Sequence, residues 1–176
     1  MSKTTEVEIA VIGAGPGGYA AAFRAADLGK KVVLIDRDPT LGGVCLNRGC
    51  IPSKALLHIA KVMDETNNLS KMGVSYNKPD IDLEKIRLHK NKIVSQLNQG
   101  IDKMAKARGV ETIQGLASFK NNNELEVKTK SSNITIKYEK CIIATGSTSG
   151  MIPGISINHD SILTSRTALE LVDIPN

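Results

Sequence analysis

Residues 6–36, EVEIAVIGAGPGGYAAAFRAADLGKKVVLID, decide the fold of this 176-residue chain. A β-branched run leads into a glycine-rich turn, a helix-forming stretch, a second apolar run and an acid, Asp36. In such a unit Gly13 permits the tight turn, Gly15 lets a pyrophosphate approach the backbone, and Gly18 lets helix and strand pack closely. The helix N-terminus faces the phosphates, and Asp36 can accept hydrogen bonds from a ribose. A glycine-rich turn without a ligand is the alternative, but these features together predict a dinucleotide site.

The second informative stretch is residues 42–54, GGVCLNRGCIPSK. Cys45 and Cys50 stand five positions apart, and Pro52 follows them. Proline suits the first turn of a helix, because its missing N–H would be unpaired there. We therefore expect Cys50 at a helix N-terminus, where the backbone dipole favours a thiolate. The arrangement suits redox chemistry, although the spacing alone leaves open a structural disulfide or two buried free thiols.

Two further polar residues lie on the helix expected after Pro52, which should run to about residue 67 or 68. Lys54 would lie in its first turn, where a positive charge opposes the helix dipole. This placement indicates another use for the charge, and a solvated lysine is the alternative. His58 follows one turn later, and we assign it no catalytic role because a helix histidine is more often a surface or core residue.

Composition limits the classes of function. The formal net charge of +5 comes from scattered lysines, and 3% aromatic content without tryptophan offers little for nucleic-acid bases to stack on. The N-terminal residues lack the apolar core of a signal peptide, and no long apolar run predicts a membrane span. We expect a cytoplasmic protein that binds neither nucleic acid nor membrane. In that compartment three cysteines favour a catalytic pair with one odd thiol, Cys141.

The middle of the chain predicts a connection and a second helix. Residues 70–79 read as a connection with a short strand at 74–76. Asp82 is a candidate N-cap for a long helix that ends at Gly109. Apolar residues recur along it at intervals near three and four, which predicts one buried face. We expect this face to pack on a sheet or across a subunit contact.

From Val110 onwards the pattern changes to strands. Three short alternating segments, ending at Tyr138, predict an antiparallel meander. The run Cys141–Ala144 is apolar without alternation, as expected of a parallel strand buried on both sides. It ends in Thr145-Gly146-Ser147, at the strand end where open α/β sheets bind ligands, although an ordinary turn would look the same. A short helix is expected from about Arg166 to Leu171. The predicted class is α/β, with a Rossmann-like parallel sheet, helices and a three-stranded antiparallel meander.

Several of these motifs resemble the N-terminal FAD-binding region of the class I pyridine nucleotide-disulfide oxidoreductases. They are the Gly13–Gly18 turn, Asp36, residues 42–54, the Gly115–Ala117 turn and the Ala144–Ser147 strand end. The resemblance covers essentially the whole chain and is strongest to the dihydrolipoamide dehydrogenases. The cysteine block is the specific part of it.

The block also separates this chain from other branches and departs from the family at one position. Glutathione reductases usually have lysine where Ser53 stands, and mercuric reductases usually have valine where Ile51 stands. Arg48 replaces a usual valine between the cysteines, which could alter the charge near them. Outside the block, Asp36 replaces a usual glutamate, which shortens the reach to the ribose but keeps its chemistry.

The resemblance implies FAD as the cofactor and a redox-active disulfide between the two catalytic residues, Cys45 and Cys50. Cys45 would exchange with the substrate, and Cys50 would face the flavin. By the same resemblance, glycines cradle the pyrophosphate, Asp36 holds the ribose, Ala117 contacts the adenine through its main chain, and Lys54 lies near flavin N5. The implied cofactor contacts are Gly13, Gly15, Gly18, Asp36, Gly43, Val44, Cys45, Lys54, Ala117, Thr145, Gly146 and Ser147.

The resemblance further implies an incomplete FAD-binding domain in residues 1–150 and, in 151–176, a connection toward an NAD-binding domain that the chain lacks. The complete enzyme would be a homodimer that oxidises dihydrolipoamide on the lipoyl domain of a 2-oxoacid dehydrogenase complex with NAD. No histidine here matches the family's acid–base histidine, so the chain alone should be inactive.

Two alternatives remain. The first is a related disulfide reductase of the glutathione or mercuric type, since most substrate-selecting residues of the family lie outside this chain. The second is a non-enzymatic module that holds a metal or thiol through Cys45, Cys50 and His58. Against a zinc site, Cys141 is distant in sequence and no second Cys or His pair supplies the usual four ligands. We therefore expect no metal.

Overall fold

The computed structural model describes residues 3–150, 152–154 and 162–173. The chain forms two compact units. The first consists of Met1–Cys45 and Leu97–Thr148, and the second of Leu46–Gln96 and Ser149–Asn176. The loop expected between Gly154 and Leu163 lies almost entirely outside the described residues.

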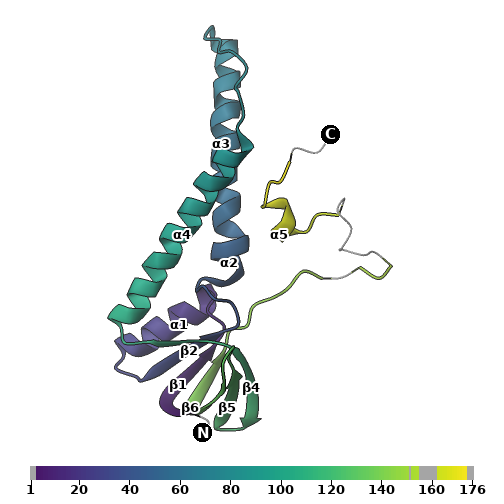
Figure 1. The fold of residues 1–176 in the computed structure, drawn as a ribbon. Coiled ribbons are helices and arrows are strands. Elements are labelled where there is room, and N and C mark those ends of the chain that lie inside the picture. Colours follow the sequence, from purple (N-terminus) through teal and green to yellow (C-terminus); the bar gives the residue numbers. More distant parts are fainter. Residues whose placement is uncertain (1–2, 151, 155–161, 174–176) are drawn as a thin grey trace. The chain divides into compact units, whose positions relative to one another are not determined.

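The first unit is built on a six-stranded sheet with the order β3-β2-β1-β6-β5-β4 (Figure 1). Its strands are β1 (Lys3–Ile12), β2 (Val32–Asp36), β3 (Glu111–Gln114), β4 (Leu116–Asn121), β5 (Glu124–Lys128) and β6 (Asn133–Ile143). The pairs β1–β2, β2–β3 and β1–β6 are parallel, while β4–β5 and β5–β6 are antiparallel. This confirms the predicted α/β class, with a parallel sheet and a three-stranded meander.

Strand β6 corrects two predictions. The run Cys141–Ala144 is not buried on both sides, since Ile143 is 64% exposed. The expected meander strand ending at Tyr138 and this run also belong to one continuous strand, β6. It pairs antiparallel with β5 from Asn133 to Lys137 and parallel with β1 as far as Ile143. Glutamate and lysine have low strand propensity, so residues 139 and 140 concealed the continuity. One strand therefore joins the meander to the parallel sheet.

The core lies between the parallel strands and the meander. Val33 and Ile35 of β2 are fully buried in one cluster with Leu125, Val127 and Ile136 of the meander. Successive strand residues point to opposite faces. Val11 of β1 and Leu34 of β2 each follow a residue of this cluster, so they point to the opposite face of the sheet, and they are also fully buried. Burial on both faces explains why these strands read as apolar runs without alternation.

Helix α1 (Pro16–Asp27) packs on this sheet through small residues, Gly18, Ala22 and Ala25, together with Phe23. The Arg108 guanidinium lies 5.2 Å from the centre of the Phe23 ring. Arg108 also pairs with the Asp27 carboxylate, at 3.0 Å. The residue that follows α4 is thereby tied to α1.

The remaining elements are helical. They are α2 (Gly43–Arg48), α3 (Cys50–Asn68), the 3-10 helix η1 (Leu69–Met72), α4 (Leu83–Ala107) and α5 (Ser165–Ala168). As predicted, Asp82 caps α4, because its Oδ1 accepts the Lys85 N–H at 3.0 Å. The prediction of a strand at residues 74–76 is wrong, because this segment is irregular. Helix α5 ends at Ala168 and is therefore shorter than the helix predicted from about Arg166 to Leu171. Within the described ranges, no helix combines the length and apolarity needed to cross a bilayer.

Candidate functional site

The glycine-rich turn between β1 and α1 needs its glycines for space. Gly13 has φ +98°, and a Cβ there would collide with the Ala144 carbonyl oxygen. A Cβ on Gly18 would collide with the Gly13 carbonyl oxygen. Gly15 is the N-cap of α1, and no side chain caps that end. The turn is therefore closely packed against Ala144 and against the start of α1. The first N–H groups of α1 have no capping side chain that would compete with a ligand.

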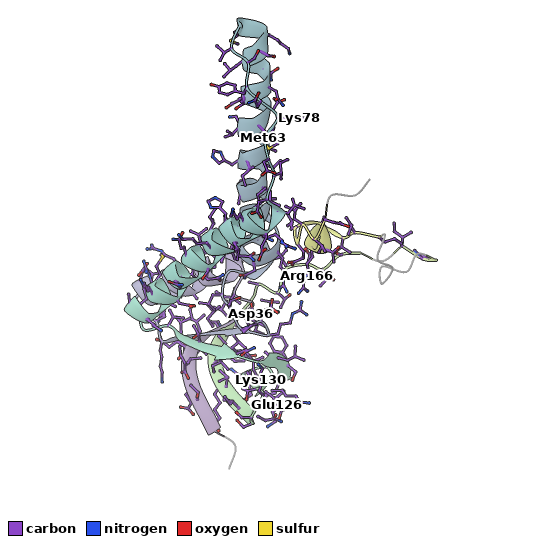
Figure 2. The ribbon with its side chains drawn as sticks, turned by 45° about the horizontal axis from the view of Figure 1, so that its top comes forward. Asp36, Met63, Lys78, Glu126, Lys130 and Arg166 are labelled. Carbon is purple, nitrogen blue, oxygen red and sulfur yellow. The ribbon has the colours of Figure 1, made fainter. Side chains whose placement is uncertain are left out.

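Asp36 lies at the end of β2, among the strands of the first unit (Figure 2). Its Oδ2 accepts the Ala14 N–H at 2.5 Å, and its Oδ1 accepts the Asp38 N–H at 2.9 Å. Both oxygens therefore hold backbone groups of the protein. The sequence predicts only a contact with ribose, so this bond to the turn is an additional finding.

Four predicted cofactor residues line one pocket of about 140 Å³ at the carboxyl ends of the parallel strands. They are Gly13, Asp36, Ala117 and Thr145, which come from four separate parts of the chain. The pocket is also lined by residues that the sequence reasoning missed: Ile12, Ile35, Arg37, Gly115 and Leu116. Four of them adjoin a predicted residue in sequence, and Gly115 begins the turn that ends at the predicted Ala117, so proximity in sequence is the signal that could have found them.

Gly115 makes the approach of the meander to this pocket possible. A Cβ at this position would lie 2.6 Å from Val127 Cγ1 and 2.9 Å from the Lys128 oxygen. The Gly115 N–H donates to the Asp36 carbonyl oxygen at 2.8 Å. The turn between β3 and β4 is thus held directly beside Asp36, which places Ala117 in the pocket.

The start of the cysteine block is tied to the glycine-rich turn. The Gly42 N–H donates to the Ala14 carbonyl oxygen at 2.8 Å. Gly43 has φ +58°, and a Cβ there would lie 2.6 Å from Gly15 Cα. Val44 is exposed and Cys45 is half-buried. The structure therefore brings Gly43 against Gly15.

Cys50 and Lys54 belong to the second unit, where both are exposed on the first turns of α3. Cys50 is the first residue of the helix, which confirms its predicted position at a helix N-terminus. The Ser53 N–H donates to the Gly49 carbonyl oxygen at 3.0 Å, and the Ser53 hydroxyl donates to the Cys50 carbonyl oxygen at 3.0 Å. Helix α2 within the cysteine block was not predicted.

No disulfide joins any of the three cysteines in the structure. Burial raises the pKa of the Cys141 thiol. A reactive cysteine needs the opposite shift, because the thiolate is the nucleophile. Cys141 therefore has the character of a packing residue, as expected of the odd thiol, and the pairing of Cys45 with Cys50 stays a prediction.

The last predicted contacts follow β6. The Ala144 N–H donates to the Ile12 carbonyl oxygen at 2.8 Å, which holds the strand end beside the glycine-rich turn. Gly146 has φ +68°, so the turn at this point uses a conformation that favours glycine. Thr145 lines the pocket, whereas Gly146 and Ser147 are exposed beyond it.

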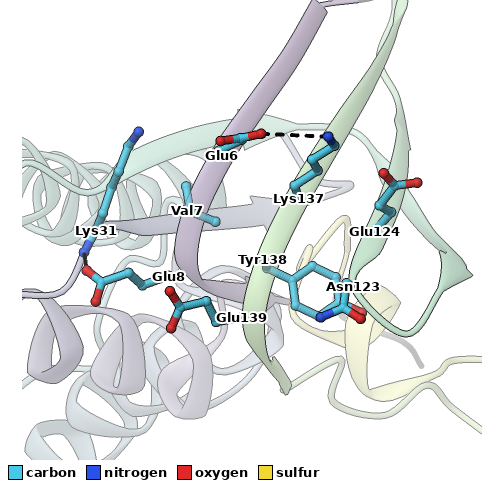
Figure 3. Close-up of a pocket in the computed structure, with 9 residues that line it drawn as sticks. All are labelled: Glu6, Val7, Glu8, Lys31, Asn123, Glu124, Lys137, Tyr138 and Glu139. Atoms are coloured by element: carbon cyan, nitrogen blue, oxygen red, sulfur yellow. Dashed lines mark hydrogen bonds and ion pairs between the residues drawn. The ribbon is translucent and has the colours of Figure 1, made fainter.

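A larger hollow of about 570 Å³ lies beside the middle of β1 (Figure 3). Its walls carry Glu6, Glu8, Glu124, Glu139, Lys31 and Lys137, with Val7, Asn123 and Tyr138. Its charges are already matched in part, since Glu6 pairs with Lys137 at 3.7 Å and Glu8 accepts from Lys30 and from the Lys31 N–H. The Lys30 ammonium lowers the pKa of Glu8. No predicted site residue lies in this hollow.

Among the described residues, no three His, Cys, Asp or Glu side chains are grouped so that they could hold a metal ion.

Comparison with known proteins identifies relatives along the whole chain. Residues 7–176 match the family model described as pyridine nucleotide-disulphide oxidoreductase. The chain is 50% identical over 176 residues to a dihydrolipoyl dehydrogenase of Buchnera aphidicola from Acyrthosiphon pisum, and 45% identical to that of Haemophilus influenzae. In both comparisons it covers 37% of the relative, so the chain spans just over a third of the length of these proteins.

A solved structure agrees with the sequence comparisons. The chain is similar, with a TM-score of 0.76 and 28% identity, to a mutant of the HOCl-induced flavoprotein disulfide reductase RclA of Escherichia coli, solved as a Cu(II) complex. The match covers 96% of this chain and 34% of that one. Since the family model, the relatives and the fold agree, the chain belongs to the pyridine nucleotide-disulphide oxidoreductase family.

Proposed function

We propose that this chain is the N-terminal, FAD-binding part of a dihydrolipoyl dehydrogenase. One observation carries the proposal: the glycine-rich turn that shares a pocket with Asp36 and Ala117 also holds the loop leading to Cys45. This connection through Ala14 and Gly15 supports a nucleotide site that adjoins a redox cysteine. A glycine-rich turn that bound no ligand would not need this arrangement.

The residues present fit FAD. The pyrophosphate would lie at the uncapped N-terminus of α1, where backbone N–H groups and the helix dipole favour an anion. The adenosine would enter the pocket between Asp36 and Ala117, and the flavin end would extend toward Gly43, Val44, Cys45 and the Thr145–Ser147 turn, with Lys54 at the N5 edge. Bound FAD supplies two-electron redox chemistry between a dithiol and a nicotinamide.

The two cysteines would carry the thiol chemistry. A substrate thiolate attacks Cys45 Sγ of a Cys45–Cys50 disulfide, forms a mixed disulfide with Cys45 and releases Cys50 as a thiolate. The second substrate thiol then attacks its own sulfur in the mixed disulfide, closes the substrate disulfide and frees Cys45. The N-terminus of α3 would stabilise the Cys50 thiolate.

The proposal extends to the activity of a full-length dihydrolipoyl dehydrogenase that contains this chain, called the longer protein below. The substrate would be dihydrolipoamide on the lipoyl domain of a 2-oxoacid dehydrogenase complex, and the oxidant NAD. The protein would act as a cytoplasmic homodimer. The 50% identity to a dihydrolipoyl dehydrogenase supports this substrate, although the chain corresponds to 37% of that relative.

A disulfide reductase with another substrate is the second candidate. Its specific support is the fold match to a flavoprotein disulfide reductase over 96% of this chain. Arg48, between the two cysteines, also differs from the valine usual in the family and would change the charge that an incoming thiol meets.

The longer protein distinguishes these candidates. We expect it to reduce NAD with dihydrolipoamide as the electron donor, and to lose this activity when Cys45 or Cys50 is replaced by serine. Preferential turnover of oxidised glutathione or mercuric ion with a reduced nicotinamide would support the second candidate. Unchanged activity in both serine variants would exclude the thiol mechanism.

A further inference from the structure

Asp36 makes more bonds within the protein than a residue kept only for a ribose would need. It ends β2, and its carboxylate lies partly buried between the glycine-rich turn and the residues that follow the strand. Oδ2 accepts the Ala14 N–H and Oδ1 accepts the Asp38 N–H. A carboxylate has about four lone-pair sites, so roughly two remain for ribose hydroxyls.

Ala14 continues this connection toward the cysteine block. Its side chain is fully buried, and its N–H donates to Asp36. Its carbonyl oxygen accepts the Gly42 N–H at 2.8 Å. One peptide segment of the turn is therefore held on one side by the acid of the nucleotide pocket and on the other by the loop that leads to Cys45.

The position of the carboxylate depends on the length of the side chain. With a single methylene, the Asp36 oxygens reach the Ala14 N–H directly from the end of β2. A glutamate would carry its oxygens one methylene farther from the backbone, so its side chain would have to bend back to reach that N–H. The aspartate thus favours the bond to the turn, while a glutamate would favour the ribose.

We propose that Asp36 is a positioning residue that fixes the glycine-rich turn, and through Ala14 the Gly42 loop, before any nucleotide binds. Removal of the carboxylate leaves the buried Ala14 N–H without its acceptor, which is a costly state. The turn then shifts, and the groups that contact a pyrophosphate lose their alignment. The effect on ligand binding rests on the proposed function, whereas the effect on the turn does not.

Hydrogen exchange in the ligand-free chain tests the turn itself. We expect Asp36→Ala to speed the exchange of the Ala14 and Gly42 amides at least tenfold, and Asp36→Asn, which retains an oxygen acceptor, to restore part of the protection. Asp80→Asn removes one negative charge from an exposed position and is the matched control. Unchanged protection of both amides in Asp36→Ala would overturn the inference, whether or not the chain binds nucleotides.

Ligand titration then separates the two roles of Asp36. ADP contains a ribose, while inorganic pyrophosphate contacts only the turn. We expect Asp36→Ala to weaken both at least severalfold, although loss of a negative charge would by itself favour an anion. Weaker binding of ADP with unchanged or tighter binding of pyrophosphate would show that Asp36 serves the ribose alone. If the unmodified chain binds neither probe, the proposed function is wrong. The exchange data would still show whether Asp36 fixes the turn.

Discussion

Individual glycines in the first turn have different physical tasks, and the structure separates them. Gly18 has no room for a Cβ, because the Gly13 carbonyl oxygen occupies that position, whereas nothing lies within 4 Å of a Cβ built on Gly17. Both are part of the same motif and adjoin each other on α1. The sequence motif assigns close packing to Gly18 and no task to Gly17, but it could not predict that Gly18 packs against the Gly13 carbonyl oxygen, which depends on the path of the preceding turn.

The two positions give a matched pair of variants. We expect Gly18→Ala to lower the free energy of unfolding by about 1–3 kcal/mol, as overpacking does, and to weaken FAD binding. Gly17→Ala should be neutral or stabilising by up to about 1 kcal/mol, because alanine has the higher helix propensity. Urea unfolding followed by circular dichroism measures both, and equal behaviour of the two variants would contradict the close packing at Gly18.

Cysteine reactivity provides a second test at the residue scale. Because burial raises the pKa of Cys141, a smaller fraction of this thiol is ionised at neutral pH than for an ordinary cysteine. We expect iodoacetamide to label exposed Cys50 faster than Cys141, and the rate at Cys141 to rise only at higher pH. Peptide mapping by mass spectrometry measures both rates, and in urea the Cys141 rate should increase. Faster labelling of Cys141 in the folded chain would refute its assignment as the inert thiol.

At the scale of elements, the strongest sequence signals were correct and the failures have identifiable causes. The turn into α1, the cap at Asp82 and the start of α3 at Cys50 were predicted because local chemistry determines them. The continuity of β6 was missed because residues 139 and 140, a glutamate and a lysine, have low strand propensity, although the pairing with β1 runs through them. Helix α2 was missed because a six-residue helix in a glycine-flanked loop has no apolar period to read.

For the candidate site, the sequence predicted residues that belong to recognisable motifs. It missed the contacts that form only when separate segments pack together. Gly13, Asp36, Ala117 and Thr145 come together as expected. The bond from Asp36 to the Ala14 N–H and the approach of Gly43 to Gly15 could not be predicted, because each depends on how separate segments are packed.

Lys90 gives a prediction for the second unit. Its side chain is 4% exposed, and its Nζ donates to the Leu169 carbonyl oxygen at 2.6 Å, so it holds the segment around α5 against α4. We expect Lys90→Met, which keeps the apolar stem, to speed amide exchange or proteolysis between residues 162 and 173. Lys92→Met, at an exposed position of the same helix, is the control. Equal protection in both variants would show that the ammonium does not hold this segment.

At the scale of the whole molecule, the chain corresponds to just over a third of its dihydrolipoyl dehydrogenase relatives. We expect it to lack dihydrolipoamide-dependent formation of NADH, because no histidine in it matches the family's acid–base residue. Absorbance of NADH in an assay with added FAD, NAD and dihydrolipoamide measures this, with a full-length dihydrolipoyl dehydrogenase relative as the positive control. Robust turnover by the chain alone would mean that its acid–base group lies within these residues.

The central claim is that one pocket and one turn hold FAD beside the cysteine block, and an FAD titration followed by the change in flavin fluorescence tests it most directly. We predict saturable binding of one FAD per chain, competition by ADP, a weaker complex with Gly18→Ala and an unchanged one with Gly17→Ala. Absence of saturable binding, or binding that ADP does not displace and Gly18→Ala does not weaken, would contradict the account.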